Sequence, residues 1–327
     1  MISIVLICHH QLSASFVELF LFNLQVQKDK VKHGNSLSQG KKKMTFEAYE
    51  LMCNLLLKEK DEAYVFAHLY LTLEWNLMSR SENVNDCHAE NIIWLDDALG
   101  FHFPKSKTNQ PGKRGDALWH VYANPGNPAV CPILALACYL FSFPGILTPT
   151  ERQPLIKQQN SSAGNISING YGKLFPGDSQ YERFMTCFRK VIRDHPDEFK
   201  RVGVDSGDLG SHSVRKGSCS YAAAGTTVAP PIVSICLRAM WSMGGVKERY
   251  LSFEKAGDQY LGRVITGMDC NEASFATSPP YFDFTGCDDS EKKDKMLDQI
   301  VSNFMVGGVR LTPRVFHIVK MCYASLC

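Results

Sequence analysis

The sequence predicts an α+β fold that is mainly helical and carries one small three-stranded antiparallel sheet. Two observations support this class. Most of the chain shows apolar residues spaced three and four apart, which is typical of helices with a buried face. In one region, three short runs rich in branched and aromatic residues, at 92–95, 98–103 and 117–122, read as strands. Asp96-Asp97 and the segment 109–112 supply turns between them.

The helices follow in order along the chain. A helix capped by Thr45 is expected over 45–57, followed by a nearly all-apolar helix over 62–78 that we expect to be buried. Residues 148–172 are rich in Gly, Ser, Asn and Gln and predict a loop, and 316–323 predicts a strand or helix that packs in trans. Further helices are predicted at 130–140, 180–193, 211–224, 232–240 and 289–304.

Composition narrows the classes of function. The formal net charge is only +2 over 327 residues, so any contact with nucleic acid must come from local clusters of charge. The twelve cysteines include no Cys-x-x-Cys pair, which argues against a zinc ribbon or a secreted disulfide scaffold and for a reducing compartment. Cys8-His9-His10 has no second pair at ligand spacing. The sequence therefore predicts no metal and no cofactor, and it contains no apolar run long enough for a membrane span.

The most informative segment is 210–217. Ser211 is a favourable N-cap and Gly225 a favourable end for the helix that follows. His212 and Arg215, three positions apart, then lie on one face of its first turn. A helix N-terminus favours an anion, so this pair predicts a phosphate site. Taken alone, His-x-x-Arg also fits an ordinary capped surface helix.

A second signal lies downstream. Pro230 and Pro231 can open the helix over 232–240, and Gly244-Gly245 is expected to break it after Trp241. Tyr250 follows Trp241 by nine positions, and a tyrosine is a plausible nucleophile toward phosphorus where cations stabilise its oxyanion.

His-x-x-Arg, a later Trp and a Tyr nine residues beyond resemble the active site of the tyrosine recombinases, the phage-integrase family. The amino-acid sequences of segments 73–84, 211–217 and 249–260 resemble those of the Crypton-type recombinases of eukaryotic mobile elements. The resemblance covers roughly residues 41–266. It implies a mainly helical tyrosine-recombinase catalytic domain at 44–266, after an N-terminal extension and linker (1–43) and before a C-terminal tail (267–327). The DNA-clamping domain that precedes the catalytic domain in this family is expected to be missing.

The resemblance also implies catalytic roles. Tyr250 would attack the phosphodiester and form a 3′-phosphotyrosine, while Arg80 and Arg215 clamp the non-bridging oxygens. His212 would assist proton transfer or bind the phosphate, and Trp241 would donate its indole N–H and pack the site. The general acid would be a lysine of the 104–108 hairpin, where the Ser-Lys-Thr motif favours Lys107 over Lys105. Tyr260 is the rival nucleophile, although its spacing from Trp241 favours a role in the core.

The predicted partner is double-stranded DNA, with self-association into a tetrameric synapse implied by the resemblance and with a nuclear location. Besides the catalytic residues, five cations are candidates to contact DNA phosphates: Lys105, Arg183, Lys190, Arg193 and Lys216. Two other hypotheses remain. One is a catalytically idle, element-derived DNA-binding protein. The other is a globular protein with accidental motif matches, in which the candidate side chains are scattered in space.

Overall fold

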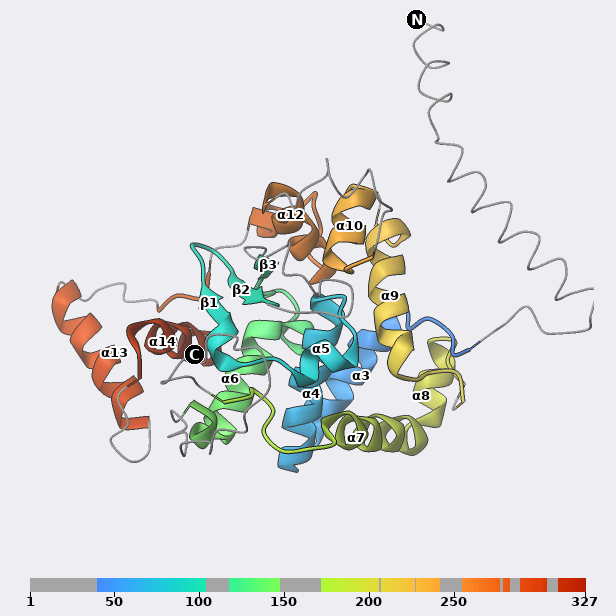
Figure 1. The fold of residues 1–327 in the computed structure, drawn as a ribbon, viewed down its shortest axis with the longest axis horizontal. Coiled ribbons are helices and arrows are strands. Elements are labelled where there is room, and N and C mark those ends of the chain that lie inside the picture. Colours follow the sequence, from blue (N-terminus) through green and yellow to red (C-terminus); the bar gives the residue numbers. More distant parts are fainter. Residues whose placement is uncertain are drawn as a thin grey trace, which may run out of the picture. The chain divides into compact units, whose positions relative to one another are not determined.

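A computed structural model describes residues 40–103, 118–147, 172–205, 207–226, 228–241, 255–276, 279–282, 289–304 and 311–327. The chain divides into two compact units, residues 1–41 and residues 42–327. The first lies almost wholly outside the described residues, and so does the Cys8-His9-His10 cluster. All that follows concerns the second unit, whose elements are labelled in Figure 1.

Helix α4 (Glu62–Asn76) is the centre of this unit. Asp61 caps it by accepting a hydrogen bond from the Ala63 N–H at 2.8 Å, and nearly all of its residues are buried. It packs against α3 (Phe46–Lys58), α6 (Pro132–Ser142), α7 (Gln180–Asp194) and α9 (Ser211–Ala224). Neighbours on several sides explain why α4 is apolar around its whole circumference.

The predicted sheet is confirmed. Strands β1 (Ile92–Trp94), β2 (Leu99–His102) and β3 (Leu118–Val121) pair antiparallel in the order β1-β2-β3. Ile93 pairs with Gly100, and Gly100 pairs with His120 across the second ladder. Strand β3 also packs against α12 (Lys255–Ile265). The sheet therefore contacts a helix that lies more than 130 residues later in the sequence.

The remaining elements are short or lie near the C-terminus. In Figure 1, α9 runs from α8 toward α10 and α12, and these last three helices contact one another. The elements not yet named are α5 (Ser81–Asn85), η2 (Ala89–Asn91), η3 (Pro128–Val130), η4 (Pro144–Leu147), α8 (Pro196–Arg201), α10 (Ile232–Arg238), η5 (Ala273–Ala276), α13 (Ser290–Phe304) and α14 (Pro313–Leu326).

The end of the chain corrects one prediction. Residues 316–323 belong to α14, which packs in cis on α6 and β1 of its own chain. Ile318, Val319 and Cys322 are buried there. The Arg314 guanidinium fixes the start of the helix by donating from Nε to the Ile92 carbonyl at 2.8 Å. Among the described residues, no helix combines the length and the apolar character that crossing a bilayer would need.

Candidate functional site

Arg80 is positioned by the way α4 ends. After Asn76 the chain turns through Met78, a non-glycine residue with a left-handed φ of 47°. Arg80 then forms the N-cap position of α5, and its carbonyl accepts from the Asn83 N–H at 2.9 Å. The turn therefore carries the guanidinium out of the buried helix to a half-exposed position. Within the described part of the chain, no carboxylate forms an ion pair with Arg80.

The start of α9 positions the second arginine. The helix begins at Ser211 and its N-cap is Gly210, one residue before the predicted cap. Ser213 closes the first turn, because its hydroxyl accepts from the Gly210 N–H at 2.9 Å and its own N–H donates to the Gly210 carbonyl at 2.8 Å. His212, the second residue of the helix, is exposed. The predicted relation of His212 and Arg215 across the first turn is confirmed.

Arg215 is nearly buried, with 8% of its surface exposed. Its Nη2 donates to the Ala239 carbonyl, whereas its buried Nη1 has no hydrogen-bond partner among the residues that the structure describes. Burial lowers the pKa of the Arg215 guanidinium, and the positive charge of Arg80 lowers it further. Residues 80 and 215 are far apart in sequence, yet the fold brings their charges together.

Glu74 is a buried carboxyl near Arg215. Its Oε1 accepts from the Ser81 hydroxyl at 2.9 Å, while Oε2 has no partner in the described part of the chain. Burial raises the pKa of Glu74 to about 8, although Ser81 and the Arg215 charge act in the opposite direction. Since Ser81 follows Arg80 directly, Glu74 ties the α4–α5 turn to the surroundings of Arg215.

The last turn of α10 completes the arrangement. Met240 has a left-handed φ of 53°, and its sulfur accepts from the Asn83 amide at 3.6 Å. The Trp241 N–H donates to the Cys236 carbonyl at 2.9 Å, and the Trp241 side chain is 40% exposed. The predicted helix over 232–240 therefore ends at Arg238, before the glycine pair. Its end contacts both arginine-bearing segments, through Ala239 to α9 and through Met240 to α5.

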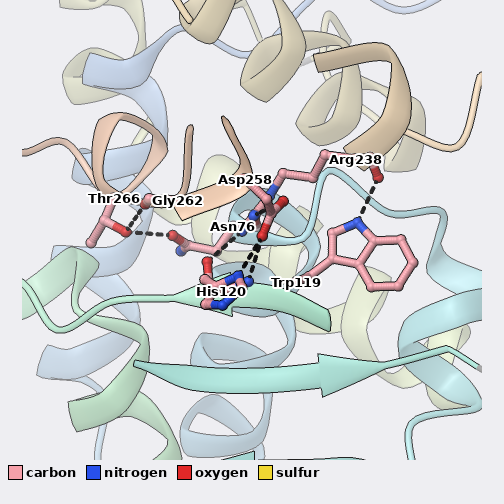
Figure 2. Close-up of polar contacts among 7 residues, drawn as sticks. All are labelled: Asn76, Trp119, His120, Arg238, Asp258, Gly262 and Thr266. Atoms are coloured by element: carbon pink, nitrogen blue, oxygen red, sulfur yellow. Dashed lines mark hydrogen bonds and ion pairs between the residues drawn. The ribbon is translucent and has the colours of Figure 1, made fainter. Parts of the chain in front are cut away.

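A second buried arginine lies just before this turn. Figure 2 shows Arg238, Asp258 and His120 converging from α10, α12 and β3. Arg238 Nη1 donates to Asp258 Oδ1 at 2.6 Å, and Asp258 Oδ2 accepts from the His120 main-chain N–H at 2.7 Å. The His120 Nδ1 lies 2.9 Å from the same oxygen and donates to it, because a carboxylate can only accept.

Main-chain groups satisfy the rest of the Arg238 guanidinium. Nε and Nη2 donate to the Asn76 carbonyl at 3.0 and 2.9 Å, and Nη2 also donates to the His120 carbonyl at 2.8 Å. The Trp119 indole N–H donates to the Arg238 carbonyl at 3.0 Å, as Figure 2 shows. The Asn76 side chain accepts from the Thr266 hydroxyl at 3.0 Å. We call Asn76, Trp119, His120, Arg238, Asp258 and Thr266 the Arg238 network.

Three of the predicted site residues, Tyr250, Lys107 and Lys105, lie outside the described residues. Arg80, Arg215 and the Trp241-bearing turn come together, with His212 one turn of helix from Arg215. The rival Tyr260 lies on α12, where its hydroxyl donates to the Val228 carbonyl at 3.0 Å and its ring contacts Phe275.

Three of the other predicted DNA contacts lie on α7. Arg183 stacks over the Phe66 ring at 4.1 Å, and Lys190 forms an ion pair with Asp194 at 2.8 Å. Arg193 lies 3.6 Å from Asp194. These three contacts are with residues of α4 and of α7 itself. Lys216 is exposed on α9 beside Arg215. That these cations bind DNA stays a prediction.

Metal ligation finds no support in the described ranges, which contain no group of three or more His, Cys, Asp or Glu side chains placed to hold an ion. The candidate site is thus a cationic one, built from two guanidiniums and an imidazole at a helix N-terminus. Such a set can bind and neutralise an oxyanion.

Comparison with known proteins identifies the fold. No protein-family model and no curated protein matches the chain. Among solved structures, a Trp-to-Phe variant of Flpe in complex with a DNA Holliday junction is similar, with a TM-score of 0.51 and 12% identity, over 95% of this chain and 72% of that one. The FLP recombinase–Holliday junction complex I is similar with a TM-score of 0.50 and 10% identity, over 96% and 72%. The chain therefore has the fold of a tyrosine-recombinase catalytic domain.

Two residues of this region were missed by the sequence patterns, Glu74 and Arg238. Each is an ionisable residue inside an apolar run, with Leu73 and Trp75 around the first and Leu237 and Ala239 around the second. A charged residue rarely becomes fully buried unless it is paired, so this placement is the signal that could have identified them.

Proposed function

We propose that this protein cleaves and rejoins DNA strands through a 3′-phosphotyrosine intermediate, as a recombinase of a mobile element of the Crypton type. The observation that carries the proposal is the Arg215 guanidinium, which is nearly buried beside Arg80 and has one nitrogen that no described residue pairs with. Leaving a buried donor unpaired costs free energy, and so does placing two like charges together. A phosphodiester bound between the arginines would remove both costs.

The chemistry assigned to the site needs a nucleophile, charge neutralisation and an acid. The Tyr250 hydroxyl attacks phosphorus, a bond forms between its oxygen and the phosphorus, and the bond to the 5′ oxygen breaks. Lys107 gives a proton to that leaving oxygen. Arg80 and Arg215 neutralise the pentavalent phosphorane, and His212 aids proton removal from the tyrosine. The 5′ hydroxyl of another strand reverses the step, so the bond energy is retained.

The partners follow from this chemistry. Double-stranded DNA is the substrate, and rejoining between duplexes requires more than one protomer, so we propose self-association on DNA and action in the nucleus. The two similar structures are complexes with a Holliday junction, a four-way DNA, which supports the assignment.

The test is covalent capture. A pool of duplexes with a randomised core and a nick beside it would be incubated with the full chain, and adducts that survive denaturant would be isolated and sequenced. We expect an adduct that the substitution Tyr250→Phe abolishes. Tyr260→Phe is the matched control, and it should leave adduct formation intact because its hydroxyl is bonded to Val228.

A second candidate function is a DNA-binding protein without catalysis. Its candidate phosphate contacts are the exposed cations of α7, among them Lys190 and Arg193. Retained duplex binding without any adduct, from the pool or from DNA selected for tight binding, would favour it over the recombinase.

A further inference from the structure

Arg238 differs from the two candidate phosphate ligands in one respect. None of its surface is exposed, and its guanidinium is bonded to Asn76, His120 and Asp258. No part of it is left for a substrate. A buried ion pair is weak evidence for a stabilising role, because desolvation offsets the attraction between the charges, but it can fix one arrangement of the elements that carry it.

The elements that it fixes meet the candidate site. Residue 238 is held twice, by its side chain and through its carbonyl, which accepts from the Trp119 indole at 3.0 Å. The next residue, Ala239, supplies the carbonyl to which Arg215 Nη2 donates. Met240 contacts Asn83, three residues beyond Arg80, and Trp241 follows. A shift of Arg238 would therefore move one fixed partner of Arg215 and the turn that carries Trp241.

We propose that Arg238 is a positioning residue for the phosphate site, which acts through the Ala239 carbonyl on Arg215 and through the main chain on Trp241. Asp258 and His120 hold Arg238 in this position from α12 and β3. The inference rests on the proposed function, which gives the site its substrate. The contacts among Arg238, Ala239 and Arg215 are nevertheless present in the protein without DNA. It can therefore be tested without DNA.

The experiment uses the full chain labelled with 5-fluorotryptophan and with ¹⁵N-arginine. Replacement of Trp241 by Phe assigns its fluorine signal, and replacement of Arg215 by Lys assigns its guanidinium signals. The probe is inorganic phosphate. We expect Arg238→Lys to shift or broaden the Trp241 and Arg215 signals and to weaken phosphate binding by roughly fivefold or more, about the effect of one misplaced hydrogen bond.

The matched control is Asp97→Asn. It breaks the ion pair between Asp97 and Arg263. Arg263 lies on α12 like Asp258, but its contacts are with Asp97 and the Tyr122 ring rather than with Arg238. We expect it to lower stability without moving the Trp241 or Arg215 signals. If Arg238→Lys fails to fold, Trp119→Phe is the second variant. It removes the bond to the Arg238 carbonyl together with part of a buried ring that packs on Phe103, and it should have the same effects, smaller in size.

The proposal is overturned if the folded variants of Arg238 or Trp119 change these signals and phosphate affinity no more than Asp97→Asn does. A failure of the proposed function looks different. DNA would then give no adduct with the unaltered protein, while the signals of Trp241 and Arg215 would still depend on Arg238.

Discussion

Two buried arginines lie close together, because Arg215 donates to the carbonyl of the residue that follows Arg238. Their surroundings are opposite. Arg238 is bonded through all three of its nitrogens, whereas the bond that Arg215 makes to the described residues runs through Nη2, and Arg215 faces the like charge of Arg80. The difference teaches that the surroundings decide the role: one arginine completes the core, and the other is left ready for an anion.

The largest loss of stability should come from breaking the ion pair between Arg238 and Asp258. Arg238→Met leaves the Asp258 carboxylate buried without its cation, and removing one member of a buried pair costs about 3–5 kcal/mol. We expect the free energy of unfolding, measured with urea, to fall by that order. The double variant Arg238→Met with Asp258→Leu should recover much of the loss. Equal losses in the single and double variants would show that the charge pair is not the cause.

An intermediate effect is expected from Glu74, through pH. Burial raises the pKa of Glu74 to about 8 in the folded protein, above its ordinary value of 4.5. Between these values the folded state holds a proton that the unfolded chain has released. Stability therefore falls as pH rises from 4.5 to 8, by roughly 1 kcal/mol per pH unit from this group, and levels off above 8.

Glu74→Gln should remove that slope, because the amide oxygen can still accept from Ser81 but cannot ionise. The measurement is urea unfolding at a series of pH values, with the difference from the unaltered protein as the readout. Glu47→Gln, at an exposed position of α3, is the control and should leave the slope unchanged. Parallel profiles for Glu74→Gln and the unaltered protein would contradict the assignment.

The smallest effect on stability should come from Arg215→Met, which sharpens the contrast with Arg238→Met. The variant removes one of two like charges and a buried nitrogen that has no partner among the described residues. These gains offset the loss of the bond from Nη2 to the Ala239 carbonyl, so we expect the free energy of unfolding to change by less than about 1 kcal/mol. Binding of inorganic phosphate, followed by titration calorimetry, should nevertheless weaken at least about tenfold, since a charged hydrogen bond is worth that much. Lys58→Met, at the exposed end of α3, controls for the loss of one charge. A stability loss as large as that of Arg238→Met would remove the distinction.

Much of the fold followed from local patterns. Thr45 caps α3 as predicted, accepting from the Ala48 N–H at 3.2 Å, and the three strands lie within one or two residues of their predicted ends. Such signals depend on neighbours in sequence, which is why they can be read without a structure. The same holds for His212 and Arg215, whose relation is fixed by one turn of helix.

What could not be predicted depends on contacts between distant segments. The Ala239 carbonyl gives no sign in the sequence that it receives Arg215, and the end of α10 is set by the left-handed Met240 rather than by the glycines that follow. The cis packing of α14 was missed for the same reason, because an apolar stripe does not specify whether its partner belongs to the same chain.

The contact of Arg314 with β1 affects whether this sheet can pair with a strand of another copy of the protein. β1 is the outer strand of the sheet, and an outer strand offers main-chain groups with which a strand of another chain can pair. Arg314 occupies the Ile92 carbonyl, and α14 covers the strand. This edge of the sheet is thereby protected from pairing with a strand of another chain, and the Arg314 side chain provides part of that protection.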